Sequence, residues 1–230
     1  MRQRIQLSFA LGAVLFLGGC ATPTKNTSRT FTTVVIDPGH GGRDSGAYGR
    51  YAPPEKFVTL DVGHRLDKNL RESQLKTVMT RSNDTFVSLD GRVALGNAEP
   101  KSIFVSIHFN DARARRVHGF ETYYYSPYAY DLALAIERNL LTIRGAVNRG
   151  VHPAQFRVLR NSIYPAVLIE CGFLSNRTEG REARSVGYRE LLADKIAEAI
   201  VDYRYGAGTY RRQPSQPSPP PAAPFGAIVP

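Results

Sequence analysis

The stretch VVIDPGHGGRDSGAYG, residues 34–49, joins the end of an apolar run to a glycine-rich loop. The run TTVVI at 32–36 is nearly continuous rather than alternating, which is typical of a strand covered on both faces of a sheet. It stops at Asp37-Pro38, and His40 follows among glycines. Because such a loop is too flexible to hold an imidazole for packing alone, His40 is a candidate functional residue whose partners should lie elsewhere in the chain.

Further apolar runs predict the other strands of the same sheet. They are 75–80, 102–107, 119–125, 156–160 and 166–171, of which 119–125 alternates and suits a position nearer an edge, and 156–160 is the weakest. Between them, apolar residues recur at helical spacing after Pro53-Pro54, from Ser88, after Pro127 and from Leu191 to Ile200. Strands that alternate with helices predict an α/β fold, here a single domain with a mixed, mostly parallel twisted sheet of about six strands flanked by helices.

The two ends of the chain differ from this domain. Residues 1–19 carry two arginines and then an apolar run, which predicts a secretory signal. The sequence LGGC that ends at Cys20 resembles the lipobox of bacterial lipoproteins, in which cleavage precedes a lipidated cysteine. The alternative is ordinary cleavage near Ala21. We expect a tether at 20–31, a catalytic domain at 32–205 and a Pro-rich disordered tail at 206–230.

Export and charge limit the partners. A lipid on Cys20 would anchor the protein to a membrane of the cell envelope, facing the periplasm; alanine rather than aspartate after the cysteine favours the outer membrane in a Gram-negative cell. The formal net charge is +10. Because an exported protein rarely meets nucleic acid, we expect no nucleic-acid partner, and the alternatives are anionic lipid, an acidic wall polymer or a merely solvated basic surface. We expect a monomer.

Chemically capable side chains follow several predicted strands. His40 follows the strand at 32–36, His108 and Asn110 follow 102–107, and Glu170 lies near the end of 166–171. Glu55 begins the first helix. In parallel sheets ligands gather beyond the carboxyl ends of the strands. A catalytic zinc takes three nitrogen or oxygen ligands, so two histidines and one glutamate suit it, and the remaining glutamate could accept a proton from water. The alternatives are a structural histidine and ordinary first-turn helix chemistry for Glu55.

Four blocks together carry a resemblance to a known family. They are VVIDPGHGGRDSGAYG, PPEK at a helix start, SIHFN and RNSIYPAVLIECGFLSN. In this order they resemble the zinc-dependent N-acetylmuramoyl-L-alanine amidases, which hydrolyse bacterial peptidoglycan, and the likeness runs from about Thr32 to Tyr203.

This resemblance implies roles for the four candidate residues. His40, Glu55 and His108 would bind one Zn²⁺ per chain, and Glu170 would be catalytic. The implied reaction cleaves the amide bond between N-acetylmuramic acid and L-alanine. Asn110 and Arg160 are weaker candidates for substrate contact. Some family members carry a long helical insertion over the zinc; the corresponding stretch 110–119 is short here, so we expect an open site.

Two other functions fit the same residues. A zinc peptidase acting on stem peptides could use the same metal set. A non-catalytic, lipid-anchored wall-binding protein is the alternative from another class, although such a protein has no need of Glu170 beside an open metal. Cys171 adjoins Glu170, and since successive strand residues point to opposite faces, we expect its thiol to pack in the core.

Overall fold

The computed structural model describes residues 24–211. The predicted signal at 1–19, the lipidation residue Cys20 and the tail beyond residue 211 lie outside this range. Within it, no helix combines the length and the apolar character that crossing a membrane requires.

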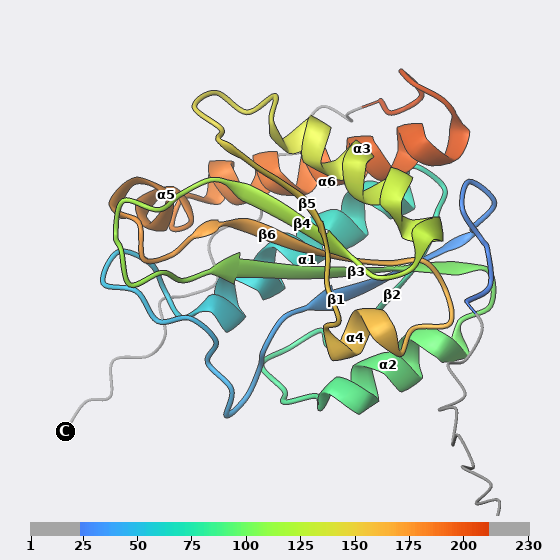
Figure 1. The fold of residues 1–230 in the computed structure, drawn as a ribbon, viewed down its shortest axis with the longest axis horizontal. Coiled ribbons are helices and arrows are strands. Elements are labelled where there is room, and N and C mark those ends of the chain that lie inside the picture. Colours follow the sequence, from blue (N-terminus) through green and yellow to red (C-terminus); the bar gives the residue numbers. More distant parts are fainter. Residues whose placement is uncertain (1–23, 212–230) are drawn as a thin grey trace, which may run out of the picture.

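A six-stranded sheet forms the centre of the molecule, in the order β2-β1-β3-β6-β4-β5 (Figure 1). The strands are β1 Thr33–Pro38, β2 Lys76–Met79, β3 Ser102–Asn110, β4 Phe120–Tyr124, β5 Asn148–Pro153 and β6 Ala166–Phe173. Neighbouring strands are parallel except for the antiparallel pair β4 and β6. The predicted fold class is therefore confirmed, and β4 lies next to an edge strand as its alternating pattern indicates.

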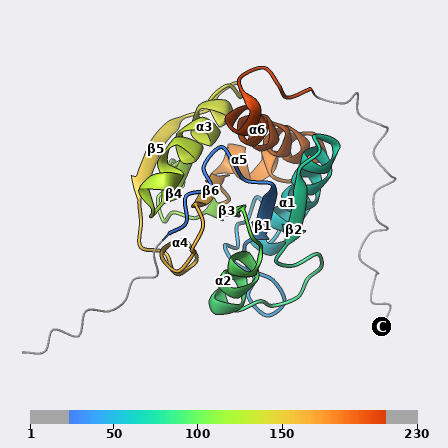
Figure 2. The same cartoon turned by 90° about the vertical axis from the view of Figure 1, so that its right-hand side faces the viewer.

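Helices cover both faces of the sheet (Figure 2). On one face lie α1 Glu55–Glu72, α3 Tyr130–Leu140 and α6 Val186–Tyr205; on the other lie α2 Leu89–Ala98 and the short α4 Arg157–Arg160. A 3-10 turn at Pro127–Ala129 precedes α3, and α5 Arg177–Glu182 follows β6. The larger core lies under α1, α3 and α6, and a smaller one lies under α2 and α4.

The first helix illustrates how the sequence pattern produces the packing. Val58, Val62, Leu66 and Leu70 are buried at four-residue spacing, so one stripe of α1 faces the sheet. Glu55 occupies the first turn, immediately after Pro54. The stripe thus fixes the helix against β1 and β3 and directs its N-terminus, with Glu55, toward the carboxyl ends of these strands.

The predicted strand at 156–160 is wrong. Residues 157–160 form α4, whose Val158 and Leu159 are buried in the smaller core. The sixth strand is β5, with the sequence NRGVHP and no buried residue. An edge strand with exposed side chains is held by backbone pairing to its single neighbour, so it leaves no hydrophobic pattern for sequence analysis to detect.

The domain also extends beyond its predicted limits. Phe31 is fully buried in the larger core, and the Thr27 hydroxyl donates to the carbonyl of Ser102 at 2.6 Å. The predicted tether is therefore wrong for this segment, which packs on the domain. At the other end, the amide of Tyr210 donates to Asp202 at 2.9 Å, so the chain folds back onto α6 after Gly206.

Candidate metal centre

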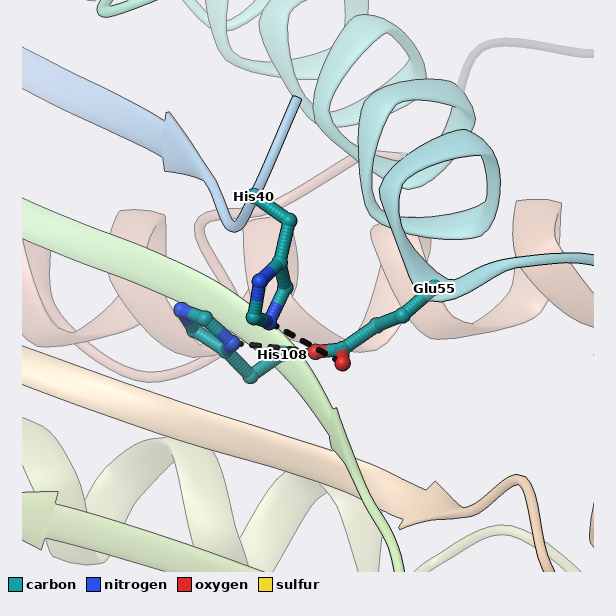
Figure 3. A group of neighbouring side chains, drawn as sticks. All are labelled: His40, Glu55 and His108. Carbon is teal, nitrogen blue, oxygen red and sulfur yellow. Dashed lines mark hydrogen bonds and ion pairs between the residues drawn. The ribbon is translucent and has the colours of Figure 1, made fainter. Parts of the chain in front are cut away.

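Three side chains from different elements converge at the carboxyl edge of the sheet (Figure 3). His40 lies in the loop after β1, Glu55 begins α1 and His108 lies on β3. Nε2 of His40 is 3.0 Å from Oε2 of Glu55, and Nδ1 of His108 is 2.9 Å from Oε1. One ligand atom of each residue lies within 4.8 Å of the others. The structure thus brings together the three residues that the sequence proposed as metal ligands.

Glycines make room for this group. A Cβ atom on Gly39 would lie 2.3 Å from the His108 ring, and one on Gly46 would lie 2.5 Å from Oε2 of Glu55. His40 itself has a φ of 62°, in the left-handed region that non-glycine residues seldom adopt. The glycines around His40 therefore allow close approach of the backbone to functional side chains.

Two buried arginines hold the loop that carries His40. Arg92 donates to the carboxylate of Asp37 at 2.7 Å and to the carbonyl of His40 at 2.5 Å. Arg81 donates to the carbonyl of Gly39 at 2.8 Å, and burial, followed by the charge of Arg92, lowers the pKa of Arg81 to about 10. These hydrogen bonds hold the backbone carbonyls of Gly39 and His40 in place. The sequence did not indicate that either arginine contacts the loop of His40.

A further carboxylate orients His40, and sequence analysis missed it. Oδ2 of Asp44 accepts a hydrogen bond from Nδ1 of His40 at 2.9 Å. This bond leaves Nε2 directed at Glu55, which is the arrangement of a histidine ligand supported by a carboxylate. The only signal was the spacing of four residues between His40 and Asp44, which is common in loops.

Glu55 is held in its ionised form. Burial opposes ionisation, but hydrogen bonds from His108 and His40 outweigh it and keep the pKa of Glu55 well below its usual range. The amides of Ala47 and Phe109 also donate to this carboxylate, at 2.7 and 2.9 Å. A buried, preoriented anion between two imidazoles is suited to binding a cation.

Glu170 lies beside this group on the neighbouring strand. It is the Cα partner of His108 in the β3–β6 register, so both side chains rise from the same face of the sheet. Its Oε2 is buried and has no hydrogen-bond partner in residues 24–211. Burial, followed by the charges of Glu55 and Glu121, raises the pKa of Glu170 well above its usual range. Cys171, which comes next, is fully buried in the larger core, as predicted.

The two weaker candidates lie differently. Asn110 donates to Glu121 at 3.3 Å, close to Glu170 across the β4–β6 pair. Arg160 is exposed and contacts the adjacent Asn161. A cavity of about 250 Å³ adjoins His40 and His108. Its wall contains Phe86, Leu89, Phe156 and Arg157 but not Arg160. The structure therefore does not bring Arg160 to the site.

The donor set of this site fits a zinc ion. Two imidazoles and a carboxylate supply the ligand types that zinc prefers, and the buried, unpartnered oxygen of Glu170 lies on the strand beside them. Three such ligands beside a buried carboxylate are the groups that a metal-dependent hydrolase uses.

Comparison with known proteins identifies the family. The profile described as N-acetylmuramoyl-L-alanine amidase matches residues 34–202, and the chain belongs to this family. It is 37% identical over 175 residues to N-acetylmuramoyl-L-alanine amidase LytC of Bacillus subtilis, covering 74% of this chain but 35% of LytC. It is 36% identical over 196 residues to the uncharacterized protein YqiI of the same organism, covering 84% of this chain and 93% of YqiI.

A solved structure agrees with this assignment. The N-acetylmuramoyl-L-alanine amidase AmiC2 of Nostoc punctiforme superposes with a TM-score of 0.72 at 40% identity. The superposition covers 74% of this chain and 96% of the AmiC2 chain. The similarity therefore includes nearly all of the AmiC2 chain.

Proposed function

We propose that this protein is a zinc-dependent amidase that hydrolyses the bond between N-acetylmuramic acid and L-alanine in peptidoglycan. The observation that carries the proposal is the convergence of His40, Glu55 and His108 within 4.8 Å, in a chain of this family. We choose this bond because the family and the relatives reported above are named for its hydrolysis. The process that we propose it serves is remodelling of the cell wall, including separation of daughter cells.

In this proposal His40, Glu55 and His108 hold one Zn²⁺. The ion would supply Lewis acidity toward the attacking water and the amide carbonyl. Asp44 keeps the His40 ring in the orientation that presents Nε2. The backbone amides of Ala47 and Phe109 keep the Glu55 carboxylate in place.

Glu170 moves the proton. Its unpartnered Oε2 accepts the proton that water loses as its oxygen attacks the carbonyl carbon. When the carbon–nitrogen bond breaks, Glu170 returns this proton to the departing amine of L-alanine.

Product masses and metal content test this assignment. Digestion of purified peptidoglycan by the wild type should release stem peptides and leave sugars without peptide, and a chelator should stop release. Glu170→Gln should lower kcat by a factor of about 100 to 10,000 while zinc stays bound. Glu137→Gln is the matched control, since Glu137 is also buried but bonds to Thr122 between β4 and α3.

Other outcomes would favour the rival functions. Peptides cut between amino acids, with sugar still attached, would identify a zinc peptidase. Binding to peptidoglycan with no release of soluble fragments, at full zinc occupancy, would identify a non-catalytic wall-binding protein. Normal turnover by Glu170→Gln would refute only the role given to Glu170, not the amidase reaction.

We further propose an exported monomer anchored through Cys20 in the cell envelope. The signal and the LGGC sequence support this placement, and curated relatives include probable cell wall amidases of Staphylococcus aureus. The mass of the mature N-terminal peptide tests it: a diacylated Cys20 is expected. An unmodified N-terminus near Ala21 would instead identify ordinary signal cleavage.

A further inference from the structure

An arginine-lined hollow lies beside α5, outside the candidate metal centre. Arg177, Arg181 and Arg184 recur at intervals of four and three residues, so they project from one side of α5 and the turn after it. Together with Arg50 and Tyr51 they line a hollow of about 470 Å³. We call this feature the arginine hollow.

The positive charge of the arginine hollow is not neutralised. Its four arginines form no ion pair with any carboxylate in residues 24–211. Elsewhere on the same molecule, Arg65, Arg71, Arg157 and Arg189 each pair with an aspartate. A cluster of like charges without counterions repels itself, so an anion from outside the chain is its natural partner.

The acidic residues of α5 do not provide that anion. The carboxylate of Glu179 accepts hydrogen bonds from the amides of Gly119 and Phe173, at 2.8 and 2.7 Å. Glu179 and Glu182 line a different cavity, which the residues of the arginine hollow do not share. The helix therefore separates its charges, with carboxylates on one side and guanidinium groups on the other.

Close packing holds α5 against the loop that carries Arg50 and Tyr51, so the exposed arginines project from a fixed backbone. A Cβ atom on Gly180 would lie 2.7 Å from the carbonyl of Leu174 and 2.9 Å from Cβ of Tyr51. Only glycine allows this approach of α5 to the loop that carries Tyr51. Arg184 also donates to the carbonyl of Arg50, at 3.4 Å. The two walls of the hollow are thus joined by the close approach at Gly180 and by the hydrogen bond from the Arg184 side chain.

We propose that the arginine hollow binds phosphate groups of an anionic polymer in the cell envelope. Guanidinium groups present a planar fork of donors that matches phosphate oxygens in pairs. Arg116 of the loop at 110–119 lines the cavity that contains Glu179 and Glu182, so the unpaired positive charge beside α5 belongs to the arginine hollow itself. Four guanidinium groups around one hollow suit a chain with repeated charges better than a single small anion.

The position of the hollow favours a polymer over lipid headgroups. The first described residues, drawn in blue, lie at the end of the molecule opposite α5 (Figure 1). An anchor at Cys20 would hold that end toward the membrane and turn the arginine hollow away from it. The carboxyl ends of β3 and β6 lie at the same end as α5, so a bound polymer would retain the enzyme with its candidate metal centre near the wall. This inference does not depend on the amidase reaction.

Binding to long-chain inorganic polyphosphate tests the proposal. The mature chain should bind the labelled probe, as measured by fluorescence anisotropy at several salt concentrations. The triple variant R177Q/R181Q/R184Q should bind at least about tenfold more weakly, with the salt slope reduced by about three. The control K68Q/R71Q/R138Q loses the same formal charge at exposed positions and should change affinity by less than about twofold.

Several results would overturn the proposal. An equal loss in both triple variants would mean general charge attraction, and equal binding of poly-L-glutamate would mean that phosphate is not the ligand. Vesicles of anionic phospholipid that bind the wild type and lose binding in R177Q/R181Q/R184Q, with polyphosphate binding unchanged, would identify a membrane surface instead. The single variant R50Q, which leaves α5 intact, should also weaken polyphosphate binding, and unchanged affinity there would contradict the geometry.

Discussion

Replacing Asp44 tests how the metal centre is oriented. Asp44→Asn removes the charge that accepts the Nδ1 proton of His40. Carboxylates that support a histidine ligand contribute about 10- to 100-fold to metal affinity, or about 1.4 to 2.7 kcal/mol. The side chain of Asp44 is 47% exposed, so water screens its charge and the loss should fall near the lower value, about tenfold.

Competition with a zinc chelator measures this effect. The apparent affinity for zinc should fall about tenfold in Asp44→Asn, while kcat at saturating zinc stays close to that of the wild type because Glu170 is untouched. Asp131→Asn, at an exposed position in the first turn of α3, is the matched control. An unchanged affinity in Asp44→Asn, or the same loss in both variants, would show that Asp44 does not orient His40.

Three further perturbations address the scaffold. Gly46→Ala should lose zinc, because the new Cβ would lie 2.5 Å from the Glu55 carboxylate. Gly145→Ala is the control, because its Cβ meets no neighbour and it adds only the left-handed backbone cost of about 1–2 kcal/mol. The metal content of the two variants distinguishes these effects, and an equal zinc content would show that Gly46→Ala does not crowd the ligand. Arg92→Met should lower the free energy of unfolding by about 3–5 kcal/mol in urea titrations, because it leaves Asp37 buried without its ion pair, and a cost below 1 kcal/mol would contradict this reasoning. Replacing the loop residues 113–116 by serine should change activity on purified peptidoglycan less than about twofold, and strong activation would reveal an autoinhibitory loop.

The sequence by itself determined the elements that are buried and periodic. Continuous apolar runs predicted β1, β3 and β6 because strands covered on both faces must be apolar throughout. The four-residue spacing from Val58 to Leu70 predicted α1 because a helix buries one stripe. Buried positions take apolar residues, so the spacing of apolar residues predicted these elements from the sequence.

Elements that are stabilised mainly by pairing or packing with their neighbours show no such apolar pattern in the sequence. β5 is exposed and exists through backbone pairing with β4, and α4 carries too few residues for a helical period. The segment around Phe31 looked like a tether because its short sequence is mostly polar, yet Phe31 fills a place in the core. The structure that such a segment adopts depends on the surface that it contacts in the folded chain.

The candidate site divides in the same way. The sequence alone identified His40, Glu55, His108 and Glu170 as candidates, through their residue chemistry and the family resemblance. Packing alone does not explain histidine and glutamate side chains at the ends of strands and helices. Only the tertiary structure determined that three of them lie within 4.8 Å. Distances between residues far apart in the chain follow from parallel strand register and helix packing, so the support from Asp44 and the walls of the arginine hollow became visible only in the folded chain.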